Sequence, residues 1–152
     1  MDVRVGTRVP DFTLPDDAGK TFHLYDELKE GPIAIYFFPK DFTSGCTAEA
    51  CEFRDNFALF RQKGVAVVGI STDDTATHAR FRKKYALPFR LLSDSDHRVA
   101  DMFGVRRTLG MIPGRTTFLI GKDGVALHIF ISQLQARRHA REALEAMTRS
   151  SP

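Results

Sequence analysis

Residues 31–46 of this chain read GPIAIYFFPKDFTSGC. The segment 33–38 is a near-continuous apolar run, which is typical of a β-strand buried on both faces of a parallel sheet. Gly31 and Pro32 precede this run and Pro39 follows it, so residues that interrupt regular structure mark both of its ends. We therefore expect a central β-strand that ends in a short loop just before Cys46.

The residues after this loop show the spacing of an amphipathic helix followed by a second strand. Between about residues 47 and 62, apolar side chains recur three or four positions apart, at Ala50, Phe53, Phe57 and Phe60. Lys63 and Gly64 then close the segment as a helix C-terminus would, and residues 65–70 form another apolar run. A strand, a helix and a strand in that order predict a right-handed βαβ unit.

The rest of the chain continues this alternation of helices and strands. Helices are predicted over residues 75–85, 96–103 and about 134–147, and a strand is predicted over residues 89–92. Two hairpins are predicted around polar turns that contain glycine, one joining residues 12–14 to 21–24 and one joining residues 116–120 to 125–131. Together these elements predict an α/β fold in a single domain over residues 1–152.

The composition is that of an ordinary globular protein. The chain has 152 residues, of which 43% are hydrophobic and 27% charged, and this balance excludes disordered and fibrous classes. No apolar run approaches the length of a membrane span, and residues 1–12 lack the apolar core of a secretory signal. We therefore expect a cytoplasmic protein without a membrane partner.

The charged residues give little sign of a nucleic-acid partner. The 22 Lys and Arg residues are interleaved with 19 Asp and Glu residues, for a net charge of +3, and no long basic cluster forms. A basic DNA-associated protein is the alternative, and it predicts strongly salt-dependent binding to duplex DNA. The five histidines are scattered, with no pair four positions apart, so we expect no metal site.

Cys46 lies where the first strand has ended and the helix begins, the usual place for a ligand in an open α/β sheet. The unpaired N–H groups and the positive dipole end of a helix favour an anion, so we expect the pKa of Cys46 to fall. The hydroxyl of Thr43, three residues earlier, can donate a hydrogen bond to the resulting thiolate or to a bound oxygen atom if the loop folds back over the start of the helix. Pro39 would stiffen the loop, and the arrangement predicts a reactive thiol.

Cys51 is the second cysteine of the chain. In a continuous helix the Cα atoms of Cys46 and Cys51 lie roughly 8 to 9 Å apart, whereas a disulfide tolerates at most about 7 Å. The pair can therefore bond only if the first turns of the helix unwind. This spacing indicates a two-step cycle, in which Cys46 is oxidised first and local unwinding then brings Cys51 to it.

These residues resemble the active-site motif of the peroxiredoxins. Residues 36–41, 43–47 and 49–51 carry the motif, and their spacing is similar to that of the bacterioferritin comigratory protein (BCP) or PrxQ group of atypical two-cysteine peroxiredoxins. The resemblance covers nearly the whole chain, because other segments match in order and spacing: residues 9–14, 69–71, 87–89, 91–94 and 115–120.

The resemblance implies a thioredoxin-like fold, with a central mixed β-sheet flanked by α-helices and an N-terminal β-hairpin. It also implies a thiol peroxidase that reduces hydrogen peroxide and organic hydroperoxides. Cys46 would be the peroxidatic nucleophile and Cys51 the resolving thiol, while Pro39, Thr43 and Arg115 would complete the peroxide-binding set. The implied partner is a thioredoxin-like reductant, with no metal or cofactor, and the implied state is a monomer, with a dimer as the alternative.

Arg115 has a physical reason to belong to this set. Attack of a thiolate on an O–O bond develops negative charge on the departing oxygen, and a guanidinium stabilises both that charge and the starting thiolate. Glu49 has at least as good an interpretation as a simple stabiliser of the first helical turn. We therefore do not place Glu49 among the catalytic residues.

Four positions depart from the usual pattern of the group: Phe38, Phe42, Ser44 and Gly121. Phe42 is more apolar than the usual residue, so we expect it to favour organic hydroperoxides. The alternative function is a redox-sensing or partner-binding protein of the same fold, which would form the disulfide but show little peroxidase turnover. The presence of Pro39, Thr43, Cys46 and Arg115 together favours the peroxidase.

Overall fold

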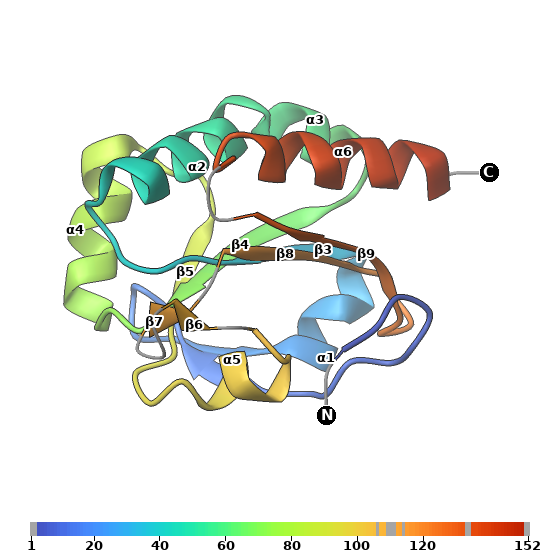
Figure 1. Cartoon of the computed structure of the whole chain (residues 1–152), viewed down its shortest axis with the longest axis horizontal. Helices are drawn as coiled ribbons and strands as arrows, with labels where there is room; N and C mark the ends of the chain where they lie inside the picture. The colour runs from blue at the N-terminus through green and yellow to red at the C-terminus, as the bar shows by residue number, and fades with distance from the viewer. Residues whose placement is uncertain (1–2, 106, 109–111, 114, 133–134, 151–152) are drawn as a thin grey trace.

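A five-stranded mixed β-sheet forms the centre of the molecule, in the strand order β5-β4-β3-β8-β9 (Figure 1). The computed structural model describes residues 3–105, 107–108, 112–113, 115–132 and 135–150. The middle strand β3 (Ile33–Phe37) runs parallel to β4 (Ala66–Ser71) and antiparallel to β8 (Thr116–Ile120). The outer strands are β5 (Arg90–Ser93), parallel to β4, and β9 (Ala126–Ile131), antiparallel to β8. The predicted mixed sheet is confirmed.

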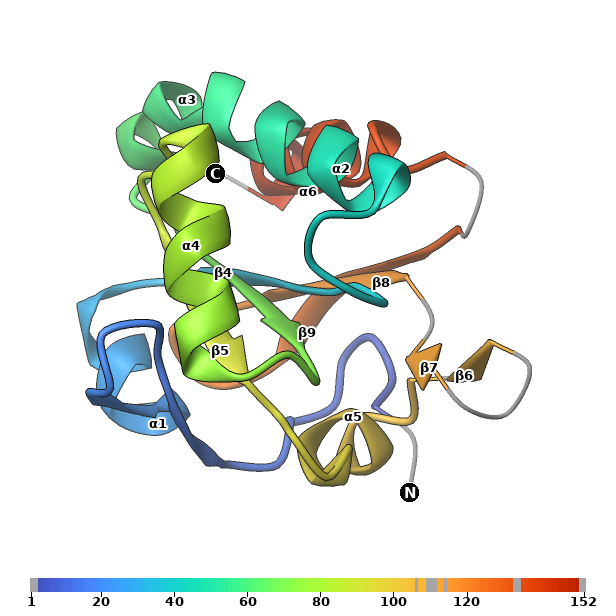
Figure 2. The ribbon, with the colours of Figure 1, turned by 90° about the vertical axis from the view of Figure 1, so that its left-hand side faces the viewer.

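Helices cover both faces of this sheet. One face carries α2 (Ser44–Asp55), α3 (Phe57–Gln62), α4 (Thr75–Tyr85) and α6 (Arg138–Ser150) (Figure 2). The other face carries α1 (Leu24–Glu27), the 3-10 turn Leu28–Glu30, α5 (Arg98–Met102) and the hairpin of β1 (Thr13–Pro15) and β2 (Thr21–His23). The predicted N-terminal hairpin is therefore confirmed.

Strand β3 is buried on both faces, as its apolar sequence predicts. Ile33, Ile35 and Phe37 belong to the hydrophobic core beneath α1 and α5. Ala34 and Tyr36, which alternate with them, belong to the core beneath α2, α4 and α6. Because successive side chains of a strand point to opposite faces, one apolar run builds both cores.

The helix predicted over residues 47–62 is wrong in its boundaries. Helix α2 begins three residues earlier, at Ser44, and Asn56 separates it from α3. The side-chain Nδ2 of Asn56 donates to the carbonyl oxygen of Glu52 at 2.8 Å. Such local side-chain bonds compete with the regular helix ladder, which explains the break.

The other predicted elements are confirmed with shifts at their ends. Helix α4 has the predicted bounds, because Asp74 accepts from the backbone N–H of Thr77 at 2.7 Å and Ala86 takes a left-handed conformation. Strand β5 lies one residue later than predicted, and α5 is shorter than the predicted helix 96–103. Helix α6 begins at Arg138, and Leu134 in the predicted helix 134–147 lies outside the described residues.

Some short elements carry no periodic signal in the sequence. They are α1, the 3-10 turn after it, and the two-residue strands β6 (Arg107–Thr108) and β7 (Ile112–Pro113), which pair with each other. None of the helices among the described residues is long and apolar enough to cross a membrane.

Candidate active site

Helix α2 places Cys46 in its first turn, as the sequence predicts. Thr43 is the N-cap residue, with the extended backbone of φ −84° and ψ 153° that starts a helix. The sulfur of Cys46 is almost completely covered, since only 1% of the residue is exposed. Neither Cys46 nor Cys51 forms a disulfide, so the structure shows the reduced form.

The sheet brings Arg115 to this sulfur. Phe37 at the end of β3 pairs with Thr116 at the start of β8, so Arg115 lies beside the chain that leads into α2. Its Nη1 atom is 3.5 Å from Sγ of Cys46 and 2.6 Å from Oε1 of Glu49. Only 6% of Arg115 is exposed, which strengthens its interaction with a charged sulfur. The structure therefore brings Cys46 and Arg115 together, as predicted.

Glu49 is a buried member of the site, and its interpretation as a stabiliser of the first turn is wrong. Helix α2 starts at Ser44, so Glu49 lies in the second turn, and its side chain is 0% exposed. Its spacing of three residues from Cys46 places both on one helix face. That spacing is the sequence signal that could have identified Glu49 as part of the site.

His139 of α6 closes the site behind Glu49. The Nδ1 atom of His139 is 2.7 Å from Oγ1 of Thr117 and 3.5 Å from Oε2 of Glu49, and its Nε2 is 3.0 Å from the carbonyl oxygen of Ser132. A carbonyl only accepts, so Nε2 carries the hydrogen and Nδ1 accepts from the Thr117 hydroxyl. Burial lowers the pKa of His139 to about 4, so the imidazole is neutral at pH 7.

The protonation of Glu49 follows from the same surroundings. Burial raises the pKa of Glu49 to about 8, against the opposing effect of the Arg115 guanidinium. Oε2 of Glu49 has no hydrogen-bond partner among the described residues, so no donor at that oxygen offsets the burial that disfavours the charged form. At neutral pH the carboxyl group is therefore mostly neutral, and the charge of Arg115 is directed to Cys46.

The pKa of Cys46 does not fall as expected from its place in the helix. Burial raises the pKa of the thiol, while Thr43 and Arg115 lower it without compensating fully, and a charged Glu49 would raise it further. The position of Cys46 at a helix N-terminus reveals nothing of its desolvation, which disfavours any charged form. A neutral Glu49 therefore helps thiolate formation.

Thr43 and Pro39 lie on the loop that precedes α2. The hydroxyl of Thr43 donates to the carbonyl oxygen of Lys40 at 2.9 Å, which fixes its side chain above the start of the helix. Pro39 is partly buried and directly follows Phe38, whose N–H donates to the carbonyl oxygen of Ile70 at 3.0 Å. Their roles in peroxide binding stay predictions.

Comparison with known proteins assigns this chain to a family. The family described as AhpC/TSA matches residues 5–129, which is most of the chain. The chain belongs to the AhpC/TSA family. "Peroxiredoxin Q, chloroplastic" of Oryza sativa subsp. japonica is 43% identical over 146 residues, which cover 95% of this chain and 67% of that protein.

Solved structures agree with this assignment. The crystal structure of "Peroxidoxin BcpB" from Mycobacterium tuberculosis has a TM-score of 0.92 and 37% identity, and the match covers 99% of both chains. A structure of the Xanthomonas campestris bacterioferritin comigratory protein has a TM-score of 0.86 and 25% identity, over 96% of this chain and 98% of that one. The expected BCP/PrxQ resemblance and thioredoxin-like fold are confirmed, and this AhpC/TSA member is a thiol peroxidase.

Phe42 lies on the loop of this peroxiredoxin that leads into α2. Phe42 is 44% exposed, and its ring makes an edge contact with Phe81 of α4 at 5.1 Å between centroids. Its φ of 67° lies in the left-handed region, which bulky residues rarely adopt. Phe38 is fully buried, and its ring centroid lies 5.3 Å from that of Tyr36. A preference for organic hydroperoxides stays a prediction.

Substitution of Gly45 by Ala should impair this peroxiredoxin without unfolding it. A Cβ atom at Gly45 would lie 2.9 Å from Nη2 of Arg115, so the guanidinium must shift, which disturbs its contact with Sγ of Cys46 at 3.5 Å. We expect the second-order rate constant with hydrogen peroxide to fall about tenfold. This is less than the cost of removing a donor completely, because the Arg115 guanidinium is displaced but still present. The helix itself should gain up to about 1 kcal/mol, because Ala is the better helix former.

The measurement is the rate of Cys46 oxidation, together with urea unfolding of the reduced protein. Ser44→Ala, at the neighbouring and exposed position, is the control and should leave the rate unchanged. A rate for Gly45→Ala equal to that of the parent would show that the position of the Arg115 guanidinium does not limit the reaction.

Proposed function

We propose that this peroxidase works through Cys46 and Cys51 in a two-step cycle. The observation that carries the proposal is the distance of 3.5 Å between Nη1 of Arg115 and Sγ of Cys46, in a helix that also holds the free thiol of Cys51. The first step oxidises Cys46 and the second forms a disulfide.

In the first step the Cys46 thiolate attacks one oxygen of a hydroperoxide. A sulfur–oxygen bond forms, the O–O bond breaks, and the other oxygen leaves as water or an alcohol after taking up a proton. The buried guanidinium of Arg115 stabilises the thiolate before attack and the negative charge on the leaving oxygen during it. We assign Thr43 and Pro39 to orientation of the peroxide, because Thr43 is the N-cap residue of α2 and Pro39 lies on the loop that leads into this helix.

In the second step the Cys51 thiolate attacks the sulfenic sulfur of Cys46. The sulfur–sulfur bond forms, the sulfur–oxygen bond breaks, and the leaving hydroxide takes up a proton to give water. Both residues lie within α2, so the standard helix rise and rotation separate their Cα atoms by roughly 8 to 9 Å. The first turns of α2 must therefore unwind before the sulfur–sulfur bond can form. A thioredoxin-like dithiol then supplies two electrons and restores both thiols.

The finer features of substrate and setting follow the family. We propose hydrogen peroxide and alkyl hydroperoxides as substrates, because the Xanthomonas campestris bacterioferritin comigratory protein is described as having alkyl peroxide reduction activity. The cytoplasmic location and the monomeric state stay predictions, and the rice relative is named as chloroplastic.

Intact-mass measurement on three chains tests the cycle. Reduced protein is treated with one equivalent of hydrogen peroxide and quenched after seconds. The unmodified chain should form an intramolecular disulfide, Cys51→Ser should retain one added oxygen, and Cys46→Ser should not react. Peroxide-dependent turnover with thioredoxin, its reductase and NADPH should then occur only in the unmodified chain.

Two results would contradict the proposal. If Cys46 stays a thiol while peroxide persists, the assignment of the nucleophile is wrong. If the disulfide forms but no dithiol reductant gives turnover, the protein senses peroxide and does not remove it catalytically.

A further inference from the structure

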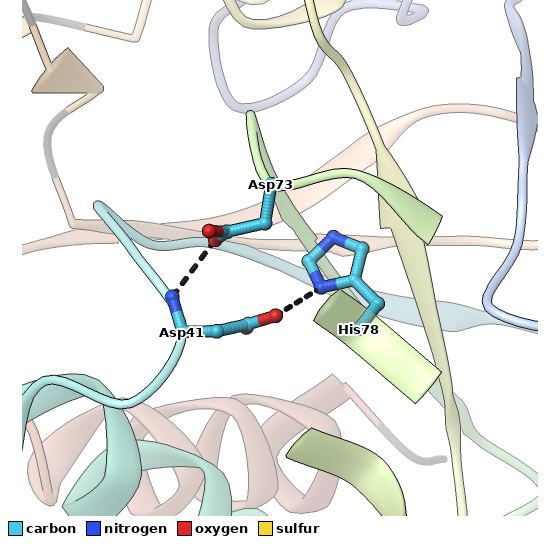
Figure 3. Close-up of side chains that lie close together, drawn as sticks. All are labelled: Asp41, Asp73 and His78. Atoms are coloured by element: carbon cyan, nitrogen blue, oxygen red, sulfur yellow. Dashed lines mark hydrogen bonds and ion pairs between the residues drawn. The ribbon is translucent and has the colours of Figure 1, made fainter. Parts of the chain in front are cut away.

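A hydrogen-bonded cluster of two buried residues and one partly buried residue lies beside the active-site loop, on the side of α4. It consists of Asp41 from the loop, His78 from α4, and Asp73 from the segment between β4 and α4 (Figure 3). Oδ2 of Asp41 is 2.6 Å from Nδ1 of His78, and both side chains are 0% exposed. The backbone N–H of Asp41 donates to Oδ2 of Asp73 at 2.8 Å. Asp41 is thus held through both its side chain and its backbone.

The partners of Asp41 are themselves fixed to the sheet. Nε2 of His78 is 3.0 Å from the carbonyl oxygen of Leu92 in β5. The hydroxyl of Ser71, at the end of β4, donates to Oδ2 of Asp73 at 2.6 Å, and the hydroxyl of Ser93 donates to the carbonyl oxygen of Asp73. The cluster therefore connects the active-site loop to two strands of the central sheet.

The contact of 2.6 Å between Oδ2 of Asp41 and Nδ1 of His78 is a hydrogen bond, so a hydrogen lies between these two atoms. The Leu92 carbonyl only accepts, so Nε2 of His78 carries a hydrogen, and Nδ1 faces the carboxyl oxygen. The pair is then either imidazolium with carboxylate or imidazole with carboxylic acid, and both forms make a short hydrogen bond. Burial raises the pKa of Asp41, against the opposing effect of His78.

A metal ion is a poorer explanation of this cluster. The three residues offer ligand atoms within 4.8 Å of one another. However, two ligands of one tetrahedral zinc ion lie about 3 Å or more apart, given metal–ligand bonds of about 2 Å. Asp41 and His78 are closer than that, and Asp73 already accepts two hydrogen bonds, so the observed arrangement is that of a hydrogen-bonded network.

The loop needs such an anchor because its next residue is strained. Phe42 has a φ of 67°, and residues held in this region persist only where their surroundings determine the conformation. Asp41 is anchored on one side of Phe42, and on the other side Thr43 caps α2, two residues before Gly45 and three before Cys46. Loss of the Asp41 contacts would let the strained turn relax, and the start of α2 would relax with it.

We propose that Asp41, with His78 and Asp73, is a positioning device that holds the start of α2 folded for reaction with peroxide and resists its unwinding for disulfide formation. The inference rests on the proposed two-cysteine cycle. The device sets the lifetime of the Cys46 sulfenic acid before Cys51 attacks it. A long lifetime exposes the sulfenic acid to a second hydroperoxide, which adds one more oxygen and gives the sulfinic acid.

The test separates the two steps of the cycle. The rate of Cys46 oxidation is measured as one added oxygen in a Cys51→Ser background, and the rate of disulfide formation and the sulfinic acid fraction are measured in chains that retain Cys51. In Asp41→Ala and in His78→Ala we expect oxidation to be slower by about tenfold, the effect of one hydrogen bond to a charged group. Disulfide formation should be faster by at least about threefold, because destabilisation of the start of α2 speeds its unwinding, and the sulfinic fraction should fall.

Matched variants keep the result interpretable. In Asp41→Asn the amide can donate to Nδ1 of His78, so both rates should return towards those of the parent chain. His23→Ala removes the exposed contact between His23 and Asp11, another Asp–His pair, and should change neither rate. All rates are measured on reduced, folded protein at a temperature well below each unfolding midpoint.

Slower oxidation of Cys46 together with faster disulfide formation would support the positioning role, because general damage to the structure is expected to slow both steps. Unchanged rates, or rates that fall together, would overturn it. If the alanine variants of Asp41 and His78 do not fold, Ser71→Ala, which removes the hydroxyl that donates to Oδ2 of Asp73 and accepts from its backbone N–H, decides by the same criterion with smaller changes. Absence of a disulfide in the parent chain would instead refute the two-cysteine cycle itself.

Discussion

Replacement of Arg115 by Met is expected to lower the rate constant of Cys46 oxidation by about a hundredfold to a thousandfold, the usual cost of removing a preorganised donor to a developing charge. The guanidinium has two tasks in this structure, since Nη1 is 3.5 Å from the sulfur and 2.6 Å from Glu49. Arg115 is one of the groups that lower the pKa of Cys46 against the effect of burial. Without it, both the thiolate and the leaving oxygen lose their positive partner.

Arg115→Lys tests whether a positive charge at this position is sufficient for fast oxidation of Cys46. An ammonium group offers one point charge, whereas the planar guanidinium contacts the sulfur and the carboxyl group at once. We expect the Lys variant to be faster than Met by about tenfold and still slower than the parent by about tenfold, since it keeps the charge but loses the fixed geometry. The measurement is the rate of oxygen addition in a Cys51→Ser background.

Arg82→Met is the control for this pair of variants. Arg82 lies on α4 and bonds Asp17 at 3.1 Å, so its loss removes a guanidinium without touching the site. The rate for this control should match that of the parent chain. A rate for Arg115→Met within about threefold of the parent would show that the first step does not depend on the buried guanidinium.

The central strands and the nucleophile were predictable because their signals are local. The apolar run at β3, the second run at β4 and the cap residues of α4 each act within a few positions of the chain. The same holds for Cys46, which follows a buried strand and opens a helix. Patterns of this kind depend on the neighbouring residues more than on tertiary packing.

The surroundings of Cys46 were not predictable, because they come from packing between distant segments. His139 reaches Glu49 from a distant part of the chain only because α6 lies against α2 and β8. The same packing buries the sulfur, and burial reverses the expected direction of its pKa shift. Asp41 and His78 likewise come from separate elements, and no regular spacing between them in the sequence predicts their contact.

Glu49→Gln is expected to make the stability of the reduced protein increase with pH relative to the parent chain. The pKa of Glu49 is about 8 in the folded protein and 4.5 as its ordinary value. Between these values the folded chain keeps a proton that the unfolded chain has released, so the stability that this proton provides is lost as pH rises towards 8. Glutamine has the same shape and a similar acceptor for Arg115, but it does not titrate.

The size of the effect follows from the width of this interval. Each pH unit contributes about 1.4 kcal/mol, so the stability difference between Glu49→Gln and the parent should grow by roughly 4 kcal/mol from about pH 4.5 to pH 8. The measurement is urea unfolding with reductant at pH 5, 6, 7 and 8. Glu145→Gln, an exposed position on α6, is the control and should give a curve parallel to that of the parent.

The titration of His139 adds a second expected feature to the pH dependence of stability. Its pKa is about 4 in the folded protein and 6.5 as its ordinary value, so between these values the unfolded chain binds a proton that the folded chain does not. In the parent chain this proton and that of Glu49 cancel between about pH 4.5 and 6.5, because folding then takes up one proton and releases one. In Glu49→Gln the cancellation is lost, and stability should rise over the same range. A stability difference that stays constant with pH would mean that Glu49 is ionised in the folded protein and competes with Cys46 for the charge of Arg115.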